Sequence, residues 1–318
     1  MNVLFTAIGR RVQLIKHFKQ LHYVIGVDSG EMPPARYFID SFYRVPKWNE
    51  DRYIDVLMDI CRKEKVDLLI PLLEKEFVLL CENRKAFERI GTFLLLSHEK
   101  IIETFNDKIK SYEFFIKNDI NTPLTYTKET IYKALNEENV KFPLIIKPLD
   151  GMGSNNVFKV KNKKELDFFI DYIENPIIQE FIEGTEYTMD VLCDFDGNVI
   201  SIVPRKRIEV RAGEVSKSKT VKDKNIIQST LDLCNKLKID KDIKPIGPLT
   251  VQCIVNSDNN IKFIEINPRF GGGIPLTFES GISYAIYLEK MVKGERVLPV
   301  LGEFEELTML RFDDAVYV

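Results

Sequence analysis

The sequence predicts two structural classes in one chain: an α/β domain with a parallel sheet over residues 1–98, followed by an α+β region over residues 99–318. Two observations lead to this prediction. In the first part, short apolar runs alternate with segments of helical periodicity, as in parallel sheets covered by helices. In the second part, apolar segments come in pairs joined by tight polar turns, which indicates antiparallel hairpins.

The elements of the first domain are expected at short intervals. Strands are predicted at residues 3–8, 23–27, 67–71 and 92–96, and helices at residues 11–20, 53–63 and 76–89. This order is typical of nucleotide-binding folds, but only Gly9 follows the first strand and no G-x-G-x-x-G is present. Because those glycines let the backbone approach a pyrophosphate, we do not expect dinucleotide binding in the usual manner.

The second region is expected to contain three hairpins and several helices. The hairpins join residues 144–147 to 157–160, 186–193 to 199–203, and 249–255 to 261–266. Their turns are rich in Asp, Asn and Gly, the residues that tight turns favour. Helices are predicted at residues 108–118, 163–173, 224–237 and 283–292.

The composition argues against several functional classes. Lys and Arg number 45 and Asp and Glu 48, for a net charge of −3, whereas a nucleic-acid-binding domain is usually basic. The apolar runs are far shorter than the ~20 residues that span a bilayer, and the start shows no export signal. The five cysteines and three histidines lack metal-ligand spacing. We therefore expect a cytoplasmic protein with reduced cysteines, no zinc, and no nucleic-acid or membrane partner.

A lysine and a glycine-containing loop form the first candidate site. Lys147 ends a buried strand, and Gly151, Gly153 and Ser154 follow in the next loop. Glycine lets backbone N–H groups approach phosphate oxygens, while the lysine supplies a point charge. The loop leads into a strand rather than a helix, so it is not a Walker P-loop. An ordinary hairpin turn is the alternative interpretation.

An acidic bend after the next apolar strand is the second candidate. Backbone groups near Glu180 and Ile182 suit the edge of an adenine ring, and a carboxylate there suits ribose hydroxyls. Glu180, Glu183 and Glu186 also fit a solvated acidic turn.

A third candidate site lies on the hairpin at residues 249–266. Its turn places Gln252 nearly opposite Glu265, and Asn267 shares the face of Glu265. A carboxylate between two isoleucines needs compensation, and Mg²⁺ shared with nucleotide phosphates would supply it. The alternative is a structural ion pair between Glu265 and Arg269.

A fourth candidate is an arginine-rich segment. Arg205, Arg207 and Arg211 are spaced so that they would face one side of an extended chain. Guanidinium groups bind carboxylates and phosphates through two parallel hydrogen bonds. A solvated edge strand is the equal alternative.

Together, these residues resemble the ATP-grasp superfamily, specifically its carbamoyl-phosphate-synthetase-like branch, over nearly the whole chain. The order and spacing of the motifs make the resemblance specific: Asp107-Lys108, Lys147-Pro148, the loop at residues 151–154, the segment at residues 179–186, and the stretch from Gln252 to Arg269. The resemblance implies a pre-ATP-grasp α/β domain at residues 1–98 and two ATP-grasp α+β subdomains, at residues 99–178 and 179–318, that clasp ATP.

The resemblance also implies roles for single residues. Lys108 and Lys147 would bind ATP phosphates, under a flap that contains Gly151, Gly153 and Ser154. Glu180 and Ile182 would bracket adenine through their backbone, and Glu186 would hold ribose. One or two Mg²⁺ (or Mn²⁺) ions would be held by Gln252, Glu265 and Asn267. Arg269 would stabilise the transferred phosphoryl group or the acyl phosphate.

The implied activity is that of an ATP- and Mg²⁺-dependent ligase. It would activate a small-molecule carboxylate as an acyl phosphate for attack by an amine or a thiol. Two alternatives are an ATP-binding regulatory or partner protein of the same fold without turnover, and an enzyme that releases the phosphorylated product. The oligomeric state is left open, with a homodimer as one option.

Two differences between this sequence and carbamoyl-phosphate synthetase narrow the range of expected substrates. The chain is too short for that complete enzyme, and Glu214 stands where a loop of that enzyme has a histidine. Bicarbonate is therefore not the expected substrate. Arg205, Arg207 and Arg211 instead indicate a larger anion, such as an amino acid carboxylate or a phosphorylated acid.

Overall fold

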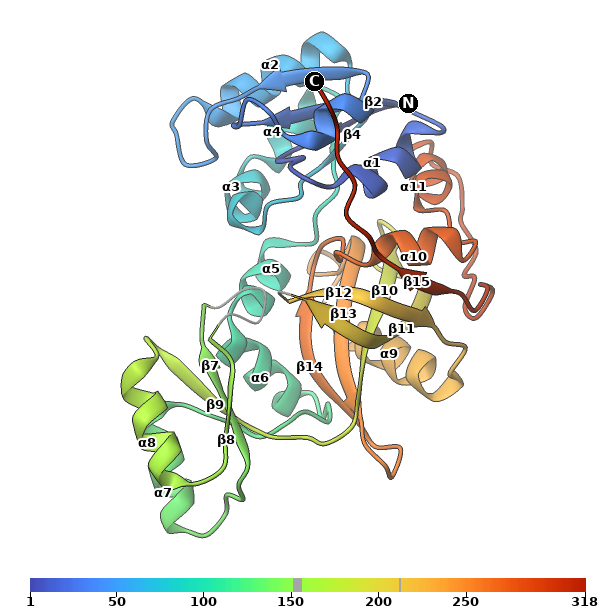
Figure 1. Cartoon of the computed structure of the whole chain (residues 1–318). Helices are drawn as coiled ribbons and strands as arrows, with labels where there is room; N and C mark the ends of the chain where they lie inside the picture. The colour runs from blue at the N-terminus through green and yellow to red at the C-terminus, as the bar shows by residue number, and fades with distance from the viewer. Residues whose placement is uncertain (151–155, 212) are drawn as a thin grey trace.

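Three sheets organise the computed structural model, which describes residues 1–150, 156–211 and 213–318 (Figure 1). The first is a five-stranded parallel sheet in the order β3-β2-β1-β4-β5, which confirms the α/β class of the first domain. Its strands are β1 (Asn2–Phe5), β2 (Tyr23–Asp28), β3 (Ser41–Arg44), β4 (Leu68–Ile70) and β5 (Phe93–Leu94).

Helices cover both faces of this parallel sheet. Val3 and Phe5 pack toward α1 (Val12–Lys19), whereas Leu4 between them packs toward α2 (Tyr53–Glu64). This is the alternation that a strand buried on both faces requires.

Two details of the first domain differ from the prediction. The edge strand β3 was not expected, because its four residues are only partly buried and form no apolar run. The helix predicted at residues 76–89 is instead α3 (Phe77–Glu82) and α4 (Arg84–Arg89). Between them, the side chain of Asn83 donates to the backbone oxygen of Leu79 at 2.8 Å, a local bond that competes with helix continuation.

The second sheet is a six-stranded antiparallel sheet in the order β14-β13-β10-β11-β12-β15. The strands are β10 (Thr185–Cys193), β11 (Val199–Arg211), β12 (Glu214–Thr220), β13 (Gly247–Val255), β14 (Ile261–Asn267) and β15 (Thr308–Leu310). The two predicted hairpins in this region, β10–β11 and β13–β14, are both present.

Helices cover the two faces of this large sheet differently. One face packs against α5 (Glu99–Asn106), α6 (Lys108–Lys117) and α9 (Lys224–Lys236). On the other, an apolar patch joins the core shared with α1, α10 (Ile274–Glu279) and α11 (Tyr284–Val292). The first domain therefore sits on the face of the large sheet that also carries polar side chains.

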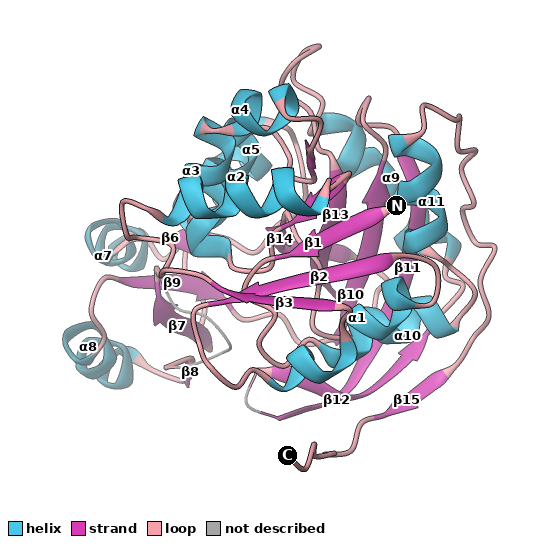
Figure 2. Ribbon diagram, turned by 90° about the horizontal axis from the view of Figure 1, so that it is seen from above, coloured by secondary structure: helices cyan, strands magenta, loops and turns pink. Residues whose placement is uncertain are grey.

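The third sheet is small and antiparallel, in the order β6-β9-β7-β8. Its strands are β6 (Thr125–Tyr126), β9 (Pro176–Glu180), β7 (Leu144–Pro148) and β8 (Phe158–Val160), with α7 (Lys128–Asn136) and α8 (Lys163–Tyr172) packed together on one side of it (Figure 2). The predicted β7–β8 hairpin is confirmed. The short elements α5, α7, β6 and β15 were not expected.

Helices α5 and α6 precede the small sheet in the chain but pack against the large one. The subdomain boundary at residue 178 stays a prediction. Within the described ranges, none of the helices combines the length and apolar character of a membrane span.

Candidate functional site

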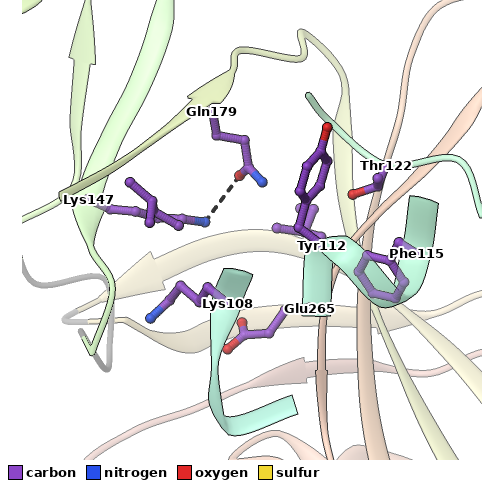
Figure 3. A pocket seen from close by; sticks show the side chains of 9 residues that line it. Lys108, Tyr112, Phe115, Thr122, Lys147, Gln179 and Glu265 are labelled. Atoms are coloured by element: carbon purple, nitrogen blue, oxygen red, sulfur yellow. Dashed lines mark hydrogen bonds between the residues drawn. The ribbon is translucent and has the colours of Figure 1, made fainter. Parts of the chain in front are cut away.

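A pocket lies between the small sheet and the edge strand β14 of the large sheet (Figure 3). Helix α6 and strands β7, β9 and β14 contribute most of its lining: Lys108, Tyr112, Phe115, Thr122, Lys147, Ile177, Gln179, Ile264 and Glu265. Figure 3 shows the Lys108 and Glu265 side chains next to each other, while Lys147 extends from the opposite wall. Two predicted phosphate-binding lysines and one predicted metal ligand thus share one pocket.

Lys147 is held in the pocket by a chain of side-chain hydrogen bonds. Its Nζ donates to Oε1 of Gln179 at 3.1 Å, and Nε2 of Gln179 donates to Oγ1 of Thr125 at 2.9 Å. Burial lowers the pKa of Lys147, and the nearby Glu265 carboxylate opposes this shift. The ammonium therefore has a fixed direction but incomplete charge compensation, which suits an anionic ligand.

Lys108 owes its place to the start of α6. Asp107 caps this helix by accepting from the backbone N–H groups of Ile109 at 2.8 Å and Lys110 at 3.1 Å, so the Asp107-Lys108 motif has a structural basis. The Lys108 ammonium donates to the backbone oxygen of Leu149. Burial lowers the pKa of Lys108, and the Glu265 carboxylate is the strongest influence that raises it.

A β-bulge at Ile264 turns Glu265 toward the site. Val255 pairs with Ile261 and Cys253 with Phe263, but Gln252 pairs with Glu265, so Ile264 is the extra residue. Because successive side chains of a strand alternate between faces, regular pairing would have turned Glu265 toward the apolar core. The predicted pairing of Gln252 with Glu265 is confirmed, and the bulge is its cause.

The three residues expected to bind metal lie on one face of the β13–β14 hairpin. Gln252 donates through Nε2 to Oε2 of Glu265 at 3.1 Å. Asn267, two residues beyond Glu265, is buried, and its Nδ2 has no hydrogen-bond partner among the described residues. Since an unpaired buried amide is costly, this end of the site is incomplete without a ligand. One carboxylate and two amides provide oxygen donors of the kind that Mg²⁺ prefers.

Arg269 does not pair with Glu265. Its Nε pairs with Oε1 of Glu74, which comes from the loop after β4 in the first domain. The alternative of a structural Glu265–Arg269 pair is therefore not observed. The positive charges of Lys108 and Lys147 act on the Glu265 carboxylate instead.

The predicted adenine and ribose residues lie around the strand change from β9 to β10. The Glu180 carboxylate pairs with Lys262 at 2.7 Å and accepts from the backbone of Leu124 at 3.1 Å. Ile182 is half-buried, and its backbone makes no hydrogen bond with the rest of the described chain. Glu186 pairs with Nε of Arg207 at 3.1 Å. These roles stay predictions.

The three arginines of the predicted anion site are not equivalent, contrary to expectation. Arg205 is 1% exposed and forms a two-bond ion pair with Asp190 at 2.6 and 3.0 Å. Arg207 lies beside the predicted nucleotide residues, and Arg211 is exposed. The pairing register shifts twice after Arg207, so the two-residue alternation does not reach Arg211. Arg205 is thus part of the core and has no access to a substrate.

Gly273 owes its lack of a side chain to this buried pair. A Cβ on Gly273 would lie 2.2 Å from Nη1 of Arg205. The backbone of Gly273 therefore packs closely against the Arg205 side chain.

Sequence reasoning missed several charged residues between the first domain and the large sheet. Arg11, in the loop before α1, lies near Arg269, Glu214, Arg311 and Glu74. The sequence contained one signal for Arg11, since the loop after the first strand of a parallel sheet lies at the edge where ligands bind. Of its neighbours, Arg269 and Glu214 were singled out in the sequence, whereas Glu74 and Arg311 come from distant segments and gave no signal.

Some predictions concern residues outside the described part of the chain. Gly151, Gly153 and Ser154 of the predicted flap lie there, so their role stays a prediction. In the described ranges, no group of three or more His, Cys, Asp or Glu residues could hold a metal ion. The predicted magnesium site has one carboxylate and two amides and does not depend on such a group.

Comparison with known proteins gives two family matches. Residues 105–273 match the ATP-grasp domain, and residues 3–95 match the PylC-like N-terminal domain. Together they cover both the parallel domain and the pocket.

Curated relatives include two carbamoyl-phosphate synthases. The chain is 22% identical to that of Methanobrevibacter smithii, over 80% of this chain and 70% of the relative. It is 25% identical to the large chain of Pseudothermotoga lettingae, over 82% of this chain but only 24% of the relative. Much of the longer relative therefore has no counterpart here.

Among solved structures, the chain resembles the biotin carboxylase domain dimer of 2-oxoglutarate carboxylase from Hydrogenobacter thermophilus, in complex with MgADP, ADP and bicarbonate. The TM-score is 0.72 at 18% identity, over 95% of this chain and 72% of the other. At this identity the match concerns the fold.

Proposed function

The chain belongs to the ATP-grasp superfamily, and we propose that it is an ATP- and Mg²⁺-dependent ligase that joins a small-molecule carboxylate to an amine or a thiol. The observation that carries this proposal is the convergence of Lys108, Lys147 and Glu265 in one pocket. Two ammonium groups and one carboxylate in one pocket suit a polyphosphate with a divalent cation.

The reaction is a phosphoryl transfer followed by an acyl transfer. A carboxylate oxygen of the substrate attacks the γ-phosphorus of ATP, and ADP leaves. The amine or thiol then attacks the carbonyl carbon of the acyl phosphate, loses a proton, and expels phosphate. In such transfers, proteins contribute mainly positioning and charge neutralisation.

The pocket residues would divide these tasks. Lys108 and Lys147 bind phosphate oxygens, and the Gln179–Thr125 hydrogen bonds keep the Lys147 ammonium directed into the pocket. Glu265, Gln252 and Asn267 would hold Mg²⁺, which neutralises phosphate charge when bound. Nδ2 of Asn267 has no partner among the described residues and, as a donor, would bind a phosphate oxygen, leaving Oδ1 for the ion.

The remaining predicted residues fit the same arrangement. Ile182 offers unpaired backbone groups to the adenine edge, and Glu186, oriented by Arg207, would accept from the ribose. Arg269, tethered to Glu74, would stabilise the transferred phosphoryl group from the side of the first domain.

ADP formation tests the proposal. The protein would be incubated with ATP, Mg²⁺ and pools of carboxylic acids, with and without amines, and ADP release measured by a coupled assay. We expect a carboxylic acid to stimulate ADP release, and Glu265→Gln to abolish the stimulation. Glu209→Gln, at an exposed position of β11, serves as the matched control.

Two results would favour the alternatives. ATP binding without stimulation by any carboxylic acid would indicate a regulatory ATP-binding protein. Stimulation that leaves a stable phosphorylated product, with no amine or thiol incorporated, would indicate a kinase-like enzyme.

A further inference from the structure

Arg11 and Glu214 converge on the bare backbone of Gly272. A Cβ built on Gly272 would lie 3.7 Å from Nη1 of Arg11 and 3.8 Å from Oε1 of Glu214. Arg11 comes from the loop before α1, and Glu214 begins β12. A positive and a negative group from different domains thus flank one point in space.

Both groups keep hydrogen-bonding capacity, although Glu214 also forms an ion pair with Arg311. The Arg11 guanidinium is half-buried and makes no hydrogen bond or close ion pair with any residue that the structure describes. Glu214 uses Oε2 to accept from Nη1 of Arg311 at 2.9 Å, while its Oε1 has no hydrogen-bond partner in the described ranges. Each therefore retains hydrogen-bonding capacity toward the space over Gly272.

The surroundings favour an anion beside Arg11. Burial first, and then the nearby guanidinium of Arg269, lowers the pKa of Arg11. Arg11, Arg269 and Arg311 carry three positive charges, against two negative charges on Glu74 and Glu214. A carboxylate between Arg11 and Arg269 would relieve the repulsion between the two guanidinium groups.

The space over Gly272 lies near the strand that carries the predicted metal-binding residues. Arg269 follows β14, the strand that carries Glu265 and Asn267, by only two residues. A carboxylate held between Arg11 and Arg269 is therefore on the side of the site from which phosphoryl transfer would reach it.

We propose that Arg11 and Glu214 form a substrate subsite for an amino acid bound as its zwitterion. The carboxylate of the amino acid lies between Arg11 and Arg269, and its ammonium group donates to Oε1 of Glu214. This inference rests on the proposed ligase function, because the bound carboxylate is the group that is phosphorylated. It replaces the predicted anion site at Arg205, Arg207 and Arg211.

Gly272 offers a selective way to test the subsite. Its φ is not in the left-handed region, and an added Cβ would meet its nearest atom at 3.6 Å, an ordinary van der Waals contact. Gly272→Ala should therefore fold, but its methyl group would fill the space between Arg11 and Glu214. Arg10→Ala, at the exposed neighbour of Arg11, is the matched control.

Hydroxylamine makes the assay independent of the natural nucleophile, because it converts an acyl phosphate into a hydroxamate. The full chain, ATP, Mg²⁺ and hydroxylamine would be combined with each of the proteinogenic L-amino acids. Each active amino acid would be compared with its deaminated acid and its carboxamide. ATP affinity would be measured separately for every variant.

We expect hydroxamate from at least one amino acid, none from its carboxamide, and at least a tenfold lower kcat/KM for the deaminated acid. Arg11→Ala and Gly272→Ala should each raise the KM for the amino acid at least tenfold. Both should bind ATP within twofold of the wild-type affinity, and Arg10→Ala should change neither quantity.

Each contrary result has a distinct meaning. Hydroxamates only from acids without an amino group would overturn the zwitterion subsite and leave the ligase function in place. An unchanged KM in Arg11→Ala and Gly272→Ala would overturn the assignment of these residues. If ATP binds but no carboxylic acid yields a hydroxamate, the proposed function fails and the inference fails with it.

Discussion

Two groups of charged side chains lie on the same face of the large sheet, and they differ in how their charges are satisfied. In the first, Asp190 accepts two hydrogen bonds from Arg205 and a third from Thr277 at 2.5 Å. In the second, Glu265 accepts from Gln252 and lies near the positive charges of Lys108 and Lys147. We call the first group closed, because its carboxylate is paired within the protein, although Nη1 of Arg205 has no hydrogen-bond partner among the described residues. We call the second group open, because its charged side chains line a pocket.

This difference explains why charge alone is a poor guide to function. Arginines in a regular pattern suggested a substrate site, yet Arg205 forms a buried ion pair with Asp190. The half-buried carboxylate of Glu265, which lines a pocket together with two lysines, is the stronger indication of a functional site. The two groups should therefore respond in opposite ways to mutation, and four experiments test this.

The largest effect is expected for Asp190→Ala. The variant leaves the Arg205 guanidinium buried without its partner, which should reduce the free energy of unfolding by about 3–5 kcal/mol. Chemical denaturation measures this quantity. The double variant Asp190→Ala with Arg205→Met should recover much of the loss. A single-variant loss below about 1 kcal/mol would contradict a structural role for the pair.

Glu265→Gln should show the opposite behaviour. Losing the central carboxylate of the open group should reduce Mg²⁺-dependent turnover on the order of 10²–10³-fold, in the range of single electrostatic contributions to catalysis. The unfolding midpoint should remain near that of the wild type. A large loss of stability with preserved turnover would place Glu265 with the closed group instead.

Lys147→Met tests the cationic side of the open group. We expect ATP affinity to fall by about 10–100-fold, the equivalent of one hydrogen bond to a charged group. Burial lowers the pKa of Lys147, so its ammonium loses its proton at a lower pH than an ordinary lysine. Wild-type ATP affinity should therefore weaken as the pH rises toward 10.5.

Titration calorimetry at several pH values would measure both effects. Lys147→Met should show less of the alkaline weakening. If its affinity matches that of the wild type at neutral pH, Lys147 does not bind phosphate.

The smallest effect is expected for the exposed pair of Glu209 and Lys217, whose side chains are about half exposed. Such pairs are screened by water and contribute little. Glu209→Gln should shift the Tm by no more than about 1 °C and leave turnover unchanged. A substantial shift in either would show that the response to mutation does not depend on burial.

The sequence predicted the parts of the fold that depend on neighbouring residues. Alternation and turn composition were sufficient for the parallel domain and for three hairpins. Asn83 ended a helix through a local hydrogen bond that periodicity does not report, and the edge strand β3 lacked a buried run. The short elements α5, α7, β6 and β15 were missed because they are too short to show a clear apolar period.

The same distinction between local and long-range features holds for the candidate site. Lys108, Lys147, Gln252 and Glu265, whose roles stay predictions, each stand in a recognisable local pattern, and the structure brings them together. Arg205 was misplaced because its partner Asp190 belongs to another strand, and the pattern of one strand does not reveal the neighbour. Arg11 and Glu74 were missed because their role depends on contacts between distant segments.

The bulge at Ile264 has a consequence for how this chain can change over generations. Residues added to or removed from the turn at 256–260 lie beyond the bulge and would leave the orientation of Glu265 and Asn267 unaltered. Loss of the single residue Ile264 would remove the bulge, because Phe263 and Glu265 would then pair regularly with Cys253 and Gln252, and Glu265 and Asn267 would keep their orientation. In descendants that keep the activity, the turn can therefore vary in length and the bulge can be lost, whereas the three consecutive residues from Glu265 to Asn267 must keep their alternation.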